Sequence, residues 1–237
     1  MIMEDAKPPC RAEDLPSRPP MQSSWLTLLV QQVLGIGCYL FFVLPYLGGH
    51  EGFNDLDGNR RYLFVSNHVS LLDTILLGGL FWSRQRVPLL VLGDAMVWQE
   101  TWIRRLLSAR LGFLIERDKK TKARIGELQS FGRSSKSFNL LVFPEGTRGD
   151  GMKVRRCQPG IYFAAEASGL DMVPVFIEGM QEVSSKRHPF RPFSGLKKIR
   201  LRFGRPIPPE EYLALDRDAM TEMVREKIQA LSPQALA

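Results

Sequence analysis

The stretch YLFVSNHVSLLDTILL, from Tyr62 to Leu77, joins a short apolar run to a longer one through a polar break. The first run is brief and rich in aromatic and aliphatic residues, which is typical of a buried strand. The second run is long enough for a helix. The break holds Asn67 and His68, and Asp73 follows inside the predicted helix. A buried strand that turns directly into a helix predicts an α/β fold.

The spacing of His68 and Asp73 predicts a strand-to-helix junction. In a continuous helix, residues five apart lie about 140° apart around the axis, so their side chains would not meet. If His68 precedes the helix, Asp73 can accept a hydrogen bond from one imidazole nitrogen and leave the other free as a base. The chain has no G-x-S-x-G nucleophile motif, so we expect the substrate to supply its own hydroxyl. The alternative is a half-buried histidine beside a helix-surface aspartate.

The rest of the chain alternates short apolar runs with helical patterns, which predicts a sheet with helices on its faces. Besides Tyr62–Ser66, the predicted strands are Pro88–Leu92, Leu111–Ile115, Leu140–Phe143, Met172–Ile177 and Ile199–Phe203. The predicted helices are Ser70–Phe81, Asp94–Ala109, Ile161–Ser168, one that starts at Pro208–Glu211, and Asp216–Leu231. We expect Asp94 to cap the start of its helix and Gly169 to end the helix that precedes it in the chain.

A second polar turn follows the predicted strand in LLVFPEGTRGD, from Leu140 to Asp150. Pro144 ends the strand and Gly146 allows a close backbone turn. In open α/β sheets ligands bind at the carboxyl ends of the strands. Arg148 carries a planar donor fork suited to phosphate, and the N–H groups around Gly146 and Thr147 are suited to the same anion. The alternative is an ordinary turn with a solvated charge pair.

The N-terminal region divides into a tail and an apolar segment. Residues 1–24 are rich in proline and mixed charge, which predicts a disordered or loosely attached tail. Residues 25–47 contain no charged side chain, and their length is close to the roughly 20 residues that span a bilayer. We expect a membrane-associated helix there, spanning or monotopic, and one folded domain over residues 50–237. The alternative is a helix packed on a soluble core.

Composition narrows the class of protein. Three widely spaced cysteines, none in a CxxC motif, argue against a disulfide framework and a cysteine zinc site. The chain carries a net charge of +7, and all of the excess lies in residues 117–156. Such a segment suits anionic phosphates of lipid or nucleic acid. Because no nucleic-acid-binding motif occurs, we expect a lipid partner and no nucleic acid.

The two polar turns together resemble the glycerolipid acyltransferases, and most closely the 1-acylglycerol-3-phosphate (lysophosphatidic acid) acyltransferases. The first motif is N-H-x4-D, from Asn67 to Asp73, and the second is FPEGTR, from Phe143 to Arg148. Weaker blocks agree in order and spacing: GFLIERD with Arg117, MVPVFIEG around Pro174, and FGRPIPPEE from Phe203 to Glu211. The resemblance covers roughly residues 60–210.

The resemblance implies a fold and a reaction. It makes residues 50–237 an α/β acyltransferase domain with a mixed, mostly parallel sheet flanked by helices, behind an N-terminal membrane-associated helix. The implied enzyme transfers a fatty acyl group from acyl-CoA or acyl-ACP to the hydroxyl of 1-acylglycerol-3-phosphate, making phosphatidic acid in phospholipid biosynthesis. His68 would be the general base and Asp73 its orienting partner, with no acyl-enzyme. The thioester would be a co-substrate, and no cofactor or metal is expected.

The resemblance also implies how the acceptor is held. The positions that would bind its phosphate are Arg117, Glu145, Gly146, Thr147 and Arg148. The expected location is a membrane, with the catalytic domain on the cytoplasmic face.

One departure from the family pattern leaves more than one lysolipid possible as the acceptor. Where many members carry a phenylalanine and a lysine, this chain has Cys157 and Gln158 before Pro159 and Gly160. A different lysolipid, such as a lysophospholipid or a lyso-ornithine lipid, therefore competes with 1-acylglycerol-3-phosphate as the acceptor.

Two further classes of protein compete with an acyltransferase. One is a lipid-binding protein without turnover, and the pair of His68 and Asp73 argues against it. The second is a thioesterase or lipase with water as acceptor, and the absent serine motif argues against that class.

Overall fold

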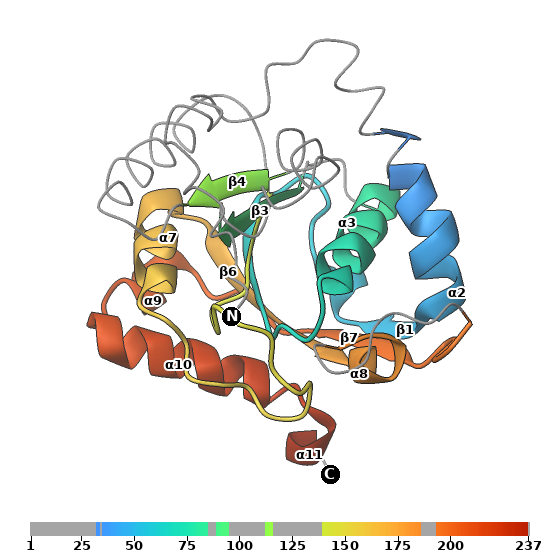
Figure 1. The fold of residues 1–237 in the computed structure, drawn as a ribbon. Helices are drawn as coiled ribbons and strands as arrows, with labels where there is room; N and C mark the ends of the chain where they lie inside the picture. The colour runs from blue at the N-terminus through green and yellow to red at the C-terminus, as the bar shows by residue number, and fades with distance from the viewer. Residues whose placement is uncertain are drawn as a thin grey trace, which may run out of the picture.

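Figure 1 shows the computed structural model of the chain, which is built on a seven-stranded sheet with helices on both faces. The structure describes residues 32–33, 35–84, 89–94, 112–115, 139–185 and 193–236. The strands are β1 (Leu47–Glu51), β2 (Tyr62–Ser66), β3 (Leu89–Asp94), β4 (Gly112–Ile115), β5 (Asn139–Val142), β6 (Asp171–Glu178) and β7 (Ile199–Phe203). Their spatial order is β1-β7-β6-β2-β5-β3-β4.

The sheet is mixed and mostly parallel, as the sequence predicts. Strands β4, β3, β5, β2 and β6 all run in the same direction. Strand β7 is antiparallel to β6, and β1 at the edge is parallel to β7. The carboxyl ends of β2 and its two neighbours, β5 and β6, therefore lie at one edge of the sheet.

The predicted strands agree closely with the observed ones, and one strand was not predicted. Strands β2 and β7 have the predicted bounds, and the other predicted strands shift by one or two residues. The unpredicted strand is β1, Leu47–Glu51, whose sequence LGGHE has no apolar run. Its strand conformation comes from pairing with β7, which is a tertiary effect that propensity does not encode.

The described helices include α3 (Leu72–Arg84), α7 (Gly160–Ser168) and α10 (Arg217–Gln229), with shorter elements η2 (Tyr39–Val43), α2 (Leu44–Tyr46), η3 (Phe53–Asp55), α8 (Met180–Val183), α9 (Pro209–Tyr212) and α11 (Pro233–Leu236). Gly169 ends α7 with a left-handed φ of 58°, as predicted. Asp216 caps α10 by accepting a hydrogen bond from the N–H of Ala219 at 2.8 Å. Asp94 ends β3, and residues 95–109 of the predicted helix lie outside the described residues.

An apolar core lies on each face of the sheet, beneath the helices that Figure 1 shows on that face. On the face covered by α7 and α10, β2 contributes Leu63 and Val65. On the face covered by α3, it contributes Phe64, whose ring lies 4.5 Å from that of Phe81. The alternation follows from the period of two along a strand. Because both faces of β2 are buried, its carboxyl end is held in a fixed position.

The segment predicted as a membrane-associated helix is described at residues 32–33 and from Gly35 onward, and its helical part ends at Tyr46. One side packs on α3, so closely that a Cβ on Gly79 would lie 2.9 Å from Val43 Cγ2. The other side leaves Leu40 and Leu44 about half exposed. Within the described ranges, the structure has no helix that is both long and apolar enough to cross a membrane. The predicted tail, residues 1–24, lies outside these ranges.

Candidate active site

The two polar turns of the sequence meet at one edge of the sheet. Strands β2 and β5 are parallel neighbours, with Val65 opposite Val142. The chain therefore leaves both strands side by side, into the turn at His68 and the turn at Glu145. The backbone N–H of His68 donates a hydrogen bond to Glu145 Oε1 at 2.9 Å. The two motifs thus form one structural unit.

The predicted hydrogen bond between His68 and Asp73 is present. His68 Nδ1 lies 2.8 Å from Asp73 Oδ2. His68 lies in the junction before α3, and Asp73 lies in the first turn of that helix. The ring therefore bends back over the start of the helix, as the five-residue spacing requires.

Asp73 is fixed by more than the histidine. Its Oδ2 also accepts the backbone N–H groups of Val69 at 2.7 Å and Ser70 at 2.9 Å. The side chain is fully buried, and Oδ1 has no hydrogen-bond partner in the described part of the chain. Three donors on one oxygen set the orientation of the carboxylate. The carboxylate can therefore hold the His68 ring in one orientation.

The other side of the His68 ring faces outward. Its side chain is 15% exposed, and its ring stacks on that of Phe143 with centroids 4.2 Å apart. Within the described ranges, Nε2 has no hydrogen-bond partner. Because Nδ1 is held by Asp73, a proton on Nδ1 leaves the Nε2 lone pair as the acceptor. The geometry suits a general base.

Asn67 is a positioning residue whose role sequence reasoning missed. Its Nδ2 donates to the carbonyl oxygen of Ile177 at 3.0 Å, and its Oδ1 accepts the N–H of Ile177 at 2.7 Å. The buried amide thereby ties the junction after β2 to the neighbouring strand β6. Asn67 is part of the N-H-x4-D motif, but its partner lies 110 residues away, so no local signal indicates this contact.

Glu145 lies where it can position the histidine. The side chain is 3% exposed. Its Oε1 accepts the His68 N–H, and its Oε2 accepts the N–H of Arg155 at 3.2 Å. Burial raises the pKa of Glu145, and the two backbone hydrogen bonds act in the opposite direction. Both carboxylate oxygens of Glu145 thus accept hydrogen bonds from the protein backbone. In this respect Glu145 differs from the other residues predicted to bind phosphate.

The turn after Glu145 presents the predicted anion-binding side chains. Gly146 adopts a left-handed φ of 66°, which favours glycine, and its N–H donates to the carbonyl oxygen of Phe143. Thr147 is exposed and Arg148 is half-buried. In the described structure, the Arg148 guanidinium has no hydrogen bond or ion pair. It is therefore available to an anion, and the turn that carries it is joined to the histidine because the N–H of Gly149 donates to the carbonyl oxygen of His68 at 2.6 Å.

Arg117, the last of the predicted phosphate-binding residues, lies outside the described residues. Cys157 follows the basic loop, but burial raises the pKa of its thiol to about 12, so the thiol stays protonated near neutral pH. Within the described ranges, no three metal-binding side chains gather into a possible metal site.

Comparisons with known proteins point to one family. The model of the family described as Acyltransferase matches residues 49–208. Among solved structures, the fold is similar to the crystal structure of the 1-acyl-sn-glycerophosphate (LPA) acyltransferase PlsC from Thermotoga maritima. That match has a TM-score of 0.60 and 21% sequence identity, over 85% of this chain and 76% of that chain. A search of curated protein sequences gave no match.

Proposed function

The chain belongs to the acyltransferase family, and we propose that it transfers a fatty acyl group from a thioester to the free hydroxyl of 1-acylglycerol-3-phosphate. The product would be phosphatidic acid. The thioester is acyl-CoA or acyl-ACP, and it acts as co-substrate. The observation that carries the proposal is the His68 ring, with Nδ1 held by Asp73 at 2.8 Å and Nε2 open at the carboxyl edge of the sheet.

His68 would act as the general base. Nε2 takes the proton of the acceptor hydroxyl as its oxygen attacks the thioester carbonyl carbon. The new C–O bond forms, the C–S bond breaks, and the proton passes from Nε2 to the departing thiolate. Asp73 stabilises the intermediate imidazolium through the Nδ1 hydrogen bond. No serine or cysteine nucleophile is required because the acceptor attacks directly.

The phosphate of the acceptor would bind at the turn after β5. Arg148 offers a planar fork beside the base and has no competing partner in the described structure. Gly146 and Thr147 shape the turn that presents it, and Arg117 is proposed as a second cation on the same phosphate. Glu145 would serve this site indirectly, because its two hydrogen bonds hold the backbones of His68 and Arg155.

Product analysis tests the proposal. Purified protein receives acyl-CoA or acyl-ACP and, separately, lysophosphatidic acid, uncharged-headgroup lysolipids, lysophospholipids and a lyso-ornithine lipid. We expect phosphatidic acid by mass spectrometry from the first acceptor, and none from the His68→Ala variant. If another lysolipid is acylated as fast or faster, that lysolipid is the acceptor in place of 1-acylglycerol-3-phosphate. If free fatty acid is released and no acylated lipid forms, the protein is a thioesterase.

We also propose that the enzyme works on a membrane surface, with its catalytic domain on the cytoplasmic face. The support is an exposed apolar surface on the helix that ends at Tyr46, with Leu40 and Leu44 about half exposed and Phe41 74% exposed. Phe193, 82% exposed, lies beside it, because its N–H donates to the Tyr46 hydroxyl at 3.1 Å. Apolar side chains gathered on one surface mark an interaction site.

Sedimentation with anionic vesicles tests the membrane surface. The Leu40→Ser/Leu44→Ser variant should bind vesicles about 10-fold more weakly, because two half-buried leucines are worth roughly 1–2 kcal/mol of transfer free energy. The matched control is Leu213→Ser/Leu236→Ser, which removes two exposed leucines elsewhere on the fold. An apolar attachment also persists in 1 M salt, where charge attraction is screened. Equal losses in both variants would contradict this placement.

A further inference from the structure

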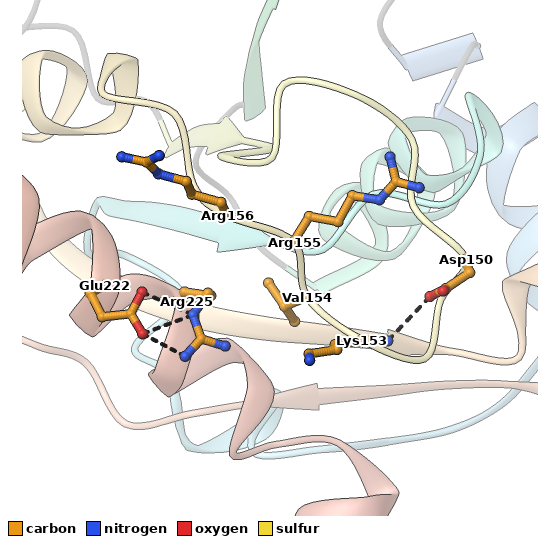
Figure 2. Close-up of a pocket in the computed structure, with 7 residues that line it drawn as sticks. All are labelled: Asp150, Lys153, Val154, Arg155, Arg156, Glu222 and Arg225. Carbon is orange, nitrogen blue, oxygen red and sulfur yellow. Dashed lines mark hydrogen bonds and ion pairs between the residues drawn. The ribbon is translucent and has the colours of Figure 1, made fainter.

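A basic hollow lies beside the candidate active site, on the outer side of the loop that follows β5. Figure 2 shows this hollow of about 670 Å³, lined by residues of the loop from Asp150 to Arg156 and by Glu222 and Arg225 of α10. This volume is within the range of roughly 300–1,000 Å³ that is typical of small-molecule sites. Four of its lining side chains are cations and two are anions.

Both anions of the hollow are already used by the protein. Glu222 accepts hydrogen bonds from Arg225 through both carboxylate oxygens, at 3.0 Å each from Nε. This ion pair lowers the pKa of Glu222. Asp150 Oδ1 accepts the backbone N–H groups of Met152 at 2.9 Å and Lys153 at 3.2 Å. Glu222 is therefore paired with Arg225, and the single carboxylate of Asp150 remains against three further cations of the lining.

The remaining cations are spread along one short stretch of the loop. In the described structure, the side chains of Lys153, Arg155 and Arg156 form no hydrogen bond or ion pair. Val154 anchors the stretch, because its side chain is buried and its N–H donates to Gln229 Oε1 at 2.8 Å. In Figure 2, Arg155 and Arg156 extend to opposite sides. Cations spread in this way match a ligand that carries separated phosphates better than a single phosphate.

The hollow is connected to the proposed base through one side chain. Glu145 accepts the Arg155 N–H on Oε2 and the His68 N–H on Oε1. The wall of the hollow and the backbone of the base are therefore held by the same buried carboxylate. A ligand bound in the hollow lies next to the reaction and not on a remote face.

We propose that this hollow binds the phosphorylated nucleotide of coenzyme A when the acyl donor is acyl-CoA. The inference rests on the proposed function, which requires a thioester donor. The nucleotide of coenzyme A carries a diphosphate bridge and a separate ribose phosphate, which suits the spread of Lys153, Arg155 and Arg156. Arg148 stays free for the acceptor, so the two substrates use different cations of the same loop.

Calorimetry with adenosine 3′,5′-bisphosphate tests the proposal without any turnover. The full-length protein in detergent should bind this nucleotide. The Lys153→Ala/Arg156→Ala variant should bind it roughly 5- to 30-fold more weakly, since two exposed ion pairs contribute about 1–2 kcal/mol together. The matched control is Arg217→Ala/Lys227→Ala, which removes the same two residue types from exposed positions of α10 and should bind like the wild type.

Kinetics with a truncated donor then distinguishes the hollow from the general charge of the protein. The wild type should have a lower KM for acyl-CoA than for the same acyl group on pantetheine, which lacks the nucleotide. The Lys153→Ala/Arg156→Ala variant should lose most of this preference. Failure of the wild type to bind the nucleotide, or an undiminished preference in the variant, would overturn the proposal. Nucleotide binding in a protein that transfers no acyl group would support the hollow and count against the proposed function.

Discussion

The proposed base and the nearby cations differ in how far the protein itself bonds their side chains. His68, Asp73 and Glu145 share a network of hydrogen bonds within the protein, which uses His68 Nδ1, Asp73 Oδ2 and both oxygens of Glu145. Arg148 and Arg156 lie a few residues away on the loop after β5, and their guanidinium groups have no partner in the described structure. The first group is buried or nearly so, whereas Arg148 is half-buried and Arg156 is exposed.

The difference follows from what each group has to do. A base must present one lone pair in one direction, and buried hydrogen bonds to fixed backbone atoms supply that order. A cation that binds a phosphate must keep its donors unpaired until the ligand arrives, because an internal ion pair would compete with it. Substitutions in the bonded network should therefore change kcat, whereas substitutions among the free cations should change KM.

The largest expected effect tests the bonded network at its centre. His68→Ala should lower kcat by about 10²–10⁴-fold, the usual contribution of a general base. The fold should persist, because alanine keeps the backbone N–H of residue 68, and it is this N–H, not the ring, that donates to Glu145. Steady-state kinetics and circular dichroism on the same sample check both points. Wild-type turnover in a folded His68→Ala protein would remove His68 from the mechanism.

Asp73→Asn separates charge from orientation. The asparagine oxygen can still accept from Val69, Ser70 and His68, so the ring stays oriented while the negative charge is lost. Since charge-assisted hydrogen bonds are worth roughly 1.5–3 kcal/mol, we expect kcat to fall about 10- to 100-fold. KM for both substrates should change little. A larger change in KM than in kcat would show that Asp73 supports binding and not the imidazolium.

Glu145→Gln tests whether the network depends on a carboxylate. An amide can accept only one of the two N–H groups on Glu145, so its NH₂ would face either His68 or Arg155 as a second donor. The free energy of unfolding should fall by about 1–3 kcal/mol, the usual cost of a buried unpaired group. Chemical denaturation measures this change, and an unchanged midpoint would contradict the assigned bonds.

The same residue gives stability a dependence on pH. Burial raises the pKa of Glu145 above its ordinary value of 4.5, so the folded chain holds that proton more tightly than the unfolded chain. Its contribution to the free energy of unfolding is therefore largest below pH 4.5 and is lost as pH rises through the raised pKa. The Glu145→Gln variant should lack this part of the pH profile. A profile that matches the wild type would show that Glu145 does not titrate in this window.

The smallest expected effect belongs to the free cations. Arg148→Ala should raise the KM for lysophosphatidic acid about 10-fold and leave the KM for the thioester nearly unchanged, because one exposed charge-assisted contact is lost. The Arg148→Lys variant should have a KM for lysophosphatidic acid between those of the wild type and Arg148→Ala, since lysine keeps the charge and lacks the planar donor fork. Arg205→Ala, at an exposed position after β7, is the control. Equal effects on both KM values would make Arg148 a structural residue.

The sequence predicted those parts of the site that depend on local spacing. The bounds of β2 and the hydrogen bond between His68 and Asp73 followed from a strand, a break and a five-residue interval. It did not predict that Asn67 bonds to Ile177, because that contact joins residues 110 positions apart. The two bonds of Glu145 were missed because they go to backbone atoms, which any sequence supplies.

The link between Asn67 and Ile177 also fixes when the site can form during protein synthesis. A ribosome that adds roughly 5–20 residues per second needs on the order of ten seconds to reach Ile177 after Asn67. Until then β2 lacks its neighbour β6, and one edge of a fully buried strand is open to pairing with other chains. A nascent chain that stalls in this interval holds the histidine and its aspartate without the contact between Asn67 and Ile177, and it exposes an apolar strand to which a chaperone could bind.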